Sequence, residues 1–490
     1  MGGGWRYPSP SAPAPIPTQA RARETVRAAI DATVELLESD AESHVTLEAI
    51  RRRSGISQGS LTHHFGSRDG LVAAAHVARY VRMCDVDRAF LEPFNGALED
   101  PRTFIAAILD MVDDMLSEHR RAVRWARLAA IGAAFGDEEL TETLSDCYTR
   151  LTSSVTTIVE AAHTSSILPP DVDARTIALL LTMHAQGLVL DDVAGVEVER
   201  SAWDHVQSRF VGAFVTPEVA ALLAQEAHRR FGDLWRAEVL GEGGRVPHAV
   251  AARLDALRTR VGEDDTTSGD ASHLRRLIES AVRQSAPATR VSSGSEPAEA
   301  LLEATVARLR SGGSRSIDVG PLRAGVDLSP QGFHRLFGTR DVLLREARVR
   351  LEIDRAATFV ARFGEHVASA CTAADMRRAI TGDAVRMADD GARNAMWQRI
   401  ETIAAAQTDP ALRTALGRVQ LAARDLLIEQ VCLAQRRGVM DPTLPPTGVA
   451  RMLEGSAFWH VFHRLDAQRP PREAWVGMLA RIAELLSPDR

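Results

Sequence analysis

Segments of this 490-residue sequence recur at a fixed separation, and this repeat constrains the fold more than any other feature. GSRDGLV follows Phe65 and GTRDVLL follows Phe337, which sets the two segments 272 residues apart. The same separation, without gaps, relates further pairs: Ala32-Thr33-Val34 and Ala304-Thr305-Val306, Leu37 and Leu309, Trp125 and Trp397, Asp137 and Asp409, Leu140 and Leu412, and Trp203 and Trp475. Because tryptophan is rare, two such matches predict a duplication, with repeats over residues 20–215 and 292–488.

Both repeats have the apolar periodicity of helices. In the first repeat, one helical face at the spacing i, i+4, i+7, i+8, i+11 is formed by Val26, Ile30, Thr33, Val34 and Leu37. Runs of β-branched residues that alternate with period two are absent from the sequence. We therefore predict an all-α fold, and the length of the chain predicts at least two domains.

Composition narrows the classes of function. The net charge of −7 means that any DNA binding must come from a local basic patch. The four scattered cysteines form no CxxC pair, and no apolar run reaches the length of a membrane span, so we expect a cytoplasmic protein without a membrane partner. The sequence lacks HExxH, GxSxG, P-loop and Rossmann glycine motifs, and its histidines lack metal spacing. We expect no enzymatic activity, no cofactor and no metal site.

Residues 45–65, VTLEAIRRRSGISQGSLTHHF, have the layout of a helix–turn–helix. Thr46 stands where it would cap a short helix over residues 47–53. Gly55 follows at the tight turn, where a residue that adopts positive φ freely is needed.

The second helix of this motif is expected over residues 58–64, with Ser57 as its cap and Leu61 and Phe65 as its core anchors. Its outward positions carry polar side chains of the size that reaches base edges and phosphates in a major groove: Gln58, Ser60, Thr62 and His63. From position 46 to position 82, six arginines stand against two acidic residues. This local excess of four positive charges favours binding to DNA.

Together these features resemble the N-terminal domain of the TetR family of transcription regulators. The resemblance is carried by Thr46, the Gly55-Ile56-Ser57 turn, Gly59, Leu61, His64, Phe65, Arg68 and Leu71. The sequence departs from the family at Thr62, where a phosphate-binding tyrosine is usual, and at Arg68, where lysine is common. The resemblance implies DNA contacts from Thr46, Ser57, Gln58, Gly59, Ser60, Thr62, His63, His64 and Arg68.

The matching segment of the second repeat, IDVGPLRAGVDLSPQGFHRLF, is a weaker helix–turn–helix. Asp327 replaces the turn glycine, and a glycine at position 320 in the leading helix is costly. Ser329 followed by Pro330 is nevertheless a sound helix start. The DNA contacts expected from this copy are Gln331, His334, Arg335 and Arg340. The alternative is a degenerate copy that only maintains the shape of the molecule.

TetR-like proteins are usually dimers joined by the last two helices of each subunit. The resemblance implies that these helices are residues 173–193 and 202–214 in one repeat and 447–465 and 472–486 in the other. A fused duplication predicts that the two repeats meet within one chain as a pseudo-dimer, with both recognition helices on one side. A domain-exchanged dimer of two chains, or further homodimerisation of the pseudo-dimer, stays open.

The family also places a ligand cavity among the middle helices of each regulatory domain. Candidate ligand contacts in the first repeat are Phe104, Met111, Met115, Trp125, Phe135, Met183 and His184. Those in the second repeat are Trp397, Phe458 and Trp459, and His119 and His184 are the polar groups able to orient a hydrophobic effector. The alternative for each residue is an ordinary place in the core.

These inferences give an order of domains and a function. We expect a disordered arm over 1–19, helix–turn–helix domains over 20–82 and 292–350, regulatory domains over 83–215 and 351–490, and a partly helical linker over 216–291. The implied function is a repressor that leaves its double-stranded operator DNA when a small apolar ligand binds. The alternative is a protein-interaction module whose helix–turn–helix elements no longer bind DNA.

Overall fold

The computed structural model describes residues 20–39, 42–234, 244–261, 270–283, 296–387 and 390–488. Within these ranges the regular elements are all helices, with no strand, which confirms the all-α prediction. The predicted disordered arm over residues 1–19 lies outside the described residues.

The first half of the chain contains two packing units. Its elements are α1 (Ala20–Ser39), η1 (Glu42–His44), α2 (Leu47–Ser54), α3 (Gln58–Phe65), α4 (Arg68–Leu91), α5 (Phe94–Ala97), α6 (Pro101–Asp114), α7 (Glu118–Ala133), α8 (Glu138–Thr164), α9 (Ala174–Met183), η2 (His184–Leu188), α10 (Val189–Ala194), α11 (Arg200–Gly212) and α12 (Pro217–Leu234). Helices α1–α3 and the start of α4 enclose a small apolar core of their own. The rest of α4 and the later helices belong to a much larger core.

The second half follows a similar order. Its elements are α13 (His248–Val261), α14 (Ala271–Arg283), α15 (Glu296–Gly312), η4 (Ser314–Ser316), α16 (Val319–Ala324), α17 (Pro330–Leu336), α18 (Arg340–Ser369), α19 (Ala373–Met387), α20 (Asp390–Ala405), α21 (Pro410–Arg436), α22 (Pro446–Ser456), α23 (Trp459–Leu465) and α24 (Arg472–Leu485). Helices α15–α17 and the start of α18 again enclose a separate small core.

The segment predicted as a linker takes part in the fold at both of its ends. Helix α12 packs against α6 and α11, whereas α13 and α14 pack against α21, and α14 also packs against α18. Ion pairs fasten α13 to α21, with Arg253 2.6 Å from Asp425 and Arg258 2.7 Å from Glu429. Helix α14 buries Leu277 and Ile278 in the large core. These helices therefore widen the second half rather than only connecting the halves.

The two halves share the large core, and they meet along several helix pairs. Helix α7 packs against α20, α10 against α21, and η2 and α11 against α22. At the η2–α22 contact the backbones are so close that a Cβ atom built on Gly187 would lie 2.5 Å from the Cα atom of Gly455. The stretch Ala174–Ala194, which contributes to this junction, is apolar enough to cross a membrane, but 78% of it is buried in the fold. Its hydropathy is therefore explained by its place in the core.

Charged side chains are also buried at this junction. Asp191 in α10 accepts hydrogen bonds from Arg424 in α21 and from Arg451 in α22. Arg424 also donates to Glu454 at 2.8 Å. All four side chains are almost fully buried. Because two positive and two negative charges face one another, the network is electrically balanced.

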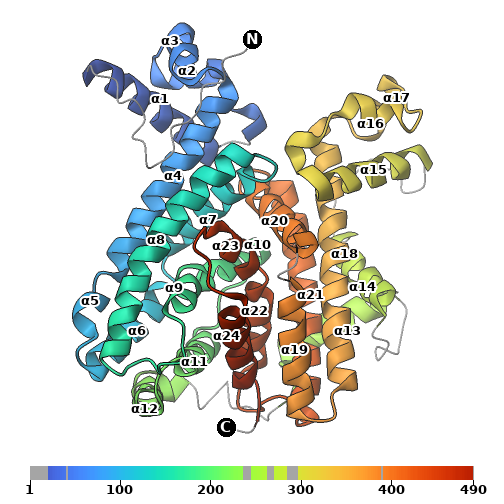
Figure 1. Cartoon of the computed structure of the whole chain (residues 1–490). Coiled ribbons are helices and arrows are strands. Elements are labelled where there is room, and N and C mark those ends of the chain that lie inside the picture. The colour runs from blue at the N-terminus through green and yellow to red at the C-terminus, as the bar shows by residue number, and fades with distance from the viewer. Residues whose placement is uncertain are drawn as a thin grey trace.

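The two helix–turn–helix units lie at the same end of the molecule (Figure 1). Helices α2 and α3 stand on one side of that end, α16 and α17 stand on the other, and the C-terminus lies at the opposite end. The long helices α4 and α18 run from these units into the shared body (Figure 1). This arrangement directs both units toward one side of the molecule.

Candidate nucleic-acid interface and ligand cavity

The first helix–turn–helix is built by local hydrogen bonds that its sequence specifies. The hydroxyl of Thr46 accepts a hydrogen bond from the Ala49 amide at 3.1 Å, and the hydroxyl of Ser57 accepts one from the Ser60 amide at 3.3 Å. These bonds satisfy amides that the first turn of a helix leaves unpaired. Gly55 ends α2 with φ of 71°, so the turn has the left-handed backbone that its sequence predicts.

Apolar anchors then fix the orientation of α3. Ile50, Leu61 and Phe65 are buried in the small core formed with α1 and α4. With Leu61 and Phe65 turned inward, the opposite face of α3 exposes Gln58, Thr62 and His63. Among the other predicted contacts, Ser60 and His64 are half-buried, and Thr46, Ser57 and Gly59 are exposed. The exposed polar face has the shape and chemistry of a recognition helix.

Arg68 does not present a free guanidinium to DNA. Its Nε donates to the carbonyl of Val45 at 2.8 Å, another nitrogen donates to the carbonyl of Glu42, and Nη1 lies 2.7 Å from Asp69. The side chain thus fastens the start of α4 to the segment before α2. A structural role explains these contacts better than the predicted phosphate contact does.

Arg340 makes the matching contacts in the second unit. Its guanidinium donates to the carbonyls of Ile317 and Ser314, at 3.3 Å and 2.7 Å. These acceptors lie before α16 as Val45 and Glu42 lie before α2. Arg340, also predicted to contact DNA, therefore has the same structural engagement as Arg68.

The local positive charge of the first unit is smaller than the sequence count suggests. Arg53 pairs with Glu35 at 2.6 Å, Arg82 pairs with Asp31, and Arg79 lies 3.8 Å from Glu38. All three acidic partners belong to α1, which lies outside the counted window. Within the window, arginine–acid pairs join positions 51 and 48 and positions 68 and 69. The count erred because charge that is distant in sequence is adjacent in the folded unit.

The second helix–turn–helix keeps the register but has a less regular turn. The Ser329 hydroxyl accepts from the Gly332 amide at 3.0 Å and caps α17, as predicted. Asp327 takes φ of 51° at the turn, a conformation that costs energy for a residue with a side chain. Gln331, His334 and Arg335 are exposed on α17, although a ring nitrogen of His334 lies 2.9 Å from the Gly338 carbonyl.

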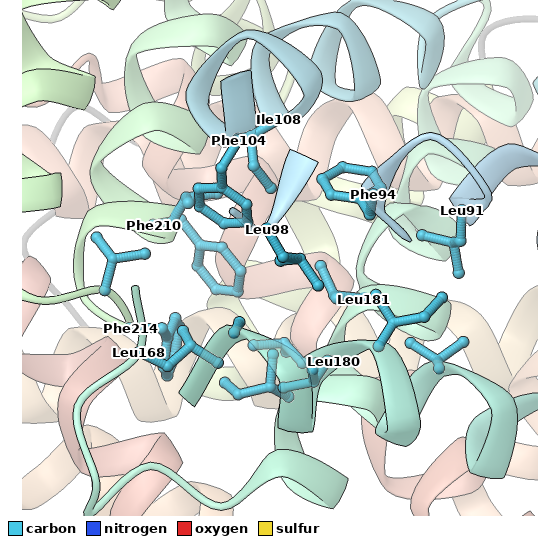
Figure 2. Close-up of a pocket in the computed structure, with 17 residues that line it drawn as sticks. Leu91, Phe94, Leu98, Phe104, Ile108, Leu168, Leu180, Leu181, Phe210 and Phe214 are labelled. Atoms are coloured by element: carbon cyan, nitrogen blue, oxygen red, sulfur yellow. The ribbon is translucent and has the colours of Figure 1, made fainter. Parts of the chain in front are cut away.

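An apolar cavity lies in the body of the first half, enclosed by the end of α4 and by α5, α6, α8, α9 and α11 (Figure 2). Its free volume is about 70 Å³, and every side chain that lines it is apolar. Four phenylalanines contribute to the wall: Phe94, Phe104, Phe210 and Phe214. Such a lining favours a hydrophobic ligand and offers no hydrogen bond to fix its orientation.

Phe104 is the one predicted ligand contact that lines this cavity. Trp125 and Phe135 lie instead at the junction of the halves: the indole of Trp125 donates to Asp192 at 3.1 Å, and Phe135 stacks on Trp397. Trp397 itself donates to the carbonyl of Ile131 at 2.6 Å. Aromatic residues predicted as ligand contacts therefore join the two halves.

The remaining candidates have other surroundings. His184 bonds to Gln207 and stacks on Phe210, with ring centroids 4.1 Å apart, so it lies behind the cavity wall. Burial lowers the pKa of His184 to about 4, which keeps its ring neutral. Met111 and Met183 are buried in the large core, as are Phe458 and Trp459, and His119 is exposed.

A second, more polar cavity adjoins the first, and the sequence analysis missed it. It is lined in part by Met115 and by Arg120, Arg124 and Arg127 from α7. The spacing of the three arginines, i, i+4 and i+7, places them on one helical face. That spacing was a readable signal, because charged residues seldom share a buried face without partners or a ligand.

Comparisons with known proteins agree with the geometry of the first unit. Residues 29–75 match the model for bacterial regulatory proteins of the tetR family. Over 84 residues the chain is 33% identical to the HTH-type transcriptional regulator BetI 1 of Chromohalobacter salexigens, which covers 17% of this chain and 40% of the relative. Over 82 residues it is 34% identical to BetI of Paraburkholderia phytofirmans, covering 16% of this chain and 40% of that protein.

The chain thus spans about two fifths of the length of the curated relatives that it matches. The matched residues contain α2 and α3 with their caps, turn and core anchors. The first half of the chain therefore carries a helix–turn–helix of the TetR family.

Proposed function

We propose that this protein is a transcriptional regulator that binds operator DNA through α3 and releases it when an apolar ligand occupies the cavity of the first half. The single observation that carries the proposal is the exposed polar face of α3, set on a capped, glycine-turned helix–turn–helix that matches the TetR family. A cytoplasmic location agrees with binding to genomic DNA and belongs to the same proposal.

We also propose that the chain is a duplication of one TetR-like unit. The support lies in recurring detail: α16, α17, α18, α21 and α24 each begin 272 residues after α2, α3, α4, α8 and α11. Asp137 and Asp409 cap α8 and α21 through the same bond to the third residue onward, at 3.0 Å in both cases. Arg68 and Arg340 hold equivalent backbone carbonyls.

The halves are proposed to form a pseudo-dimer within one chain. The shared core, the η2–α22 contact and the buried network around Asp191 support this arrangement, because each is made between residues of the two halves. Both helix–turn–helix units then face one side, as successive major grooves on one face of DNA require.

Helix α4 offers a path from ligand to DNA. Its first turns bury Leu71 and Val72 in the core of the helix–turn–helix, and its last residue, Leu91, lines the apolar cavity. A helix of 24 residues spans about 36 Å, so a ligand that displaces its far end also turns the unit that carries α3. Ligand binding then favours a state in which α3 is misplaced for the operator.

Selection of genomic DNA fragments by the full chain tests the proposal. We expect enrichment of one site, and loss of binding when Gln58 and His63 are both changed to alanine. Glu226→Gln and Arg229→Gln together form the control, because that exposed pair lies on α12, away from either helix–turn–helix. Failure of the chain to retain any fragment at low salt would refute DNA binding and favour the protein-interaction module.

A further inference from the structure

The apolar cavity and the arginine-lined cavity are neighbours. Leu91 at the end of α4 and Leu181 in α9 line both of them. Figure 2 shows these two side chains in the wall of the apolar cavity. With a free volume of about 70 Å³, that cavity holds only a short apolar group unless side chains move. Rotation of the two leucines enlarges it toward the arginines.

The charges in the second cavity are unequal. Asp87 accepts hydrogen bonds from Arg120, at 3.1 Å, and from Arg127. Arg120 also lies 3.6 Å from Asp114, at the edge of the cavity. Arg124 donates to the carbonyl of Met115 and, within the described residues, lies within 4 Å of no carboxylate oxygen. One guanidinium is therefore left without an anionic partner.

This cation is deeply buried. Arg124 retains 5% of its exposure, and its Nε has no hydrogen-bond partner in the described part of the chain. Burial lowers the pKa of the Arg124 guanidinium to about 10, which leaves it charged at neutral pH. A buried charge without a counter-ion is costly, and a bound anion would remove that cost.

Nearby acidic residues do not compensate Arg124. Asp192 pairs with Arg121 at 2.9 Å and accepts from the Trp125 indole. Asp191 is held by Arg424 and Arg451 in the network between the halves. Both carboxylates are thus engaged elsewhere, and the cavity keeps about one unit of positive charge.

We propose that the effector is an amphipathic monocarboxylate whose aliphatic body fills the apolar cavity and whose carboxylate binds Arg124 between Leu91 and Leu181. The proposal rests on the proposed function, in which the apolar cavity takes the effector. A single negative charge suits the site, because the Asp87 carboxylate repels a dianion. An arginine and a carboxylate form a short, charge-assisted pair, which supplies the orientation that the apolar cavity lacks.

The second half does not reproduce this site. At the positions 272 residues after Arg124 and Asp87, the chain has Met396 and Phe359. The residue after Arg127 at the same separation, Arg399, is paired with Glu352 at 2.9 Å. We therefore expect one carboxylate ligand for each chain.

Isothermal titration calorimetry of the full chain with decanoate and with decanol tests the proposal. The two probes share an aliphatic chain and differ in the charge of the head. We expect decanoate to bind about 10- to 100-fold more tightly than decanol, with one site per chain. In Arg124→Met the advantage of decanoate should vanish while decanol binds as before, and Arg121→Met, a charge change on the same helix, should preserve the advantage.

Equal affinity of the wild-type chain for decanoate and decanol would overturn the carboxylate site and leave an apolar effector in place. Binding of neither probe would overturn the effector proposal together with this inference. Two decanoate sites per chain would contradict the assignment to Arg124. The comparison of probes on the wild-type protein stands even if Arg124→Met fails to fold.

Discussion

Neutralising Asp191 should destabilise the protein strongly. This carboxylate faces Arg424 and Arg451, and its side chain retains 2% of its exposure. Asp191→Asn keeps the shape but leaves two buried arginines with Glu454 as their only carboxylate in the network. Removing one partner from a buried ion network costs about 3–5 kcal/mol. Urea unfolding followed by circular dichroism should show a lower midpoint of that order relative to wild type.

Restoring the charge balance provides the decisive control. Arg451→Met, combined with Asp191→Asn, leaves the Arg424–Glu454 pair, which is neutral overall. We expect the double variant to be more stable than Asp191→Asn alone, a coupling that a double-mutant cycle measures. An Asp191→Asn protein that unfolds at the wild-type midpoint, or a double variant less stable than both single variants, would refute the charge-balance reasoning.

Three further predictions concern packing, the turn and pH. Gly187→Ala should cost about 1–3 kcal/mol or more in urea unfolding, because its Cβ atom meets the backbone of Gly455, whereas Gly212→Ala, which meets nothing within 4 Å, should be neutral or stabilising. Asp327→Gly should raise the stability of the second helix–turn–helix by up to about 1 kcal/mol, since φ there is positive, and slower amide exchange in α17 would show it; unchanged exchange would argue against strain at that turn. His184 has a pKa lowered to about 4, so its unfolded form takes up a proton first as pH falls below about 6.5, and stability should decline between pH 6.5 and 4 by at most about 3 kcal/mol from this residue. His184→Leu should show a shallower decline in urea midpoints over that range, and an identical decline would contradict a neutral buried ring.

Local chemistry explains which parts of the DNA-binding unit were predictable. Thr46, Gly55 and Ser57 act on residues two to four positions away, so their roles depend on the sequence around them. The inward anchors Leu61 and Phe65 follow from helical periodicity. Each of these predictions is confirmed by the structure.

Predictions that depended on distant partners were less accurate. Arg68 has the right place for a phosphate contact, yet it holds carbonyls more than twenty positions earlier, which no local pattern reveals. Trp125 and Phe135 have the composition of a ligand pocket, but the other half of the chain covers them. Sequence cannot distinguish an aromatic residue in a pocket from one at an interface, because both are apolar and buried.

The mass of the protein–DNA complex tests the central claim most directly. The account predicts that light scattering of the full chain on its selected site finds one 53.2 kDa chain per DNA duplex. It also predicts that Gln58→Ala with His63→Ala abolishes the complex without changing the mass of the free protein. A complex with two chains on a palindromic site would contradict the pseudo-dimer within one chain, and a complex that survives the double substitution would contradict DNA reading by α3.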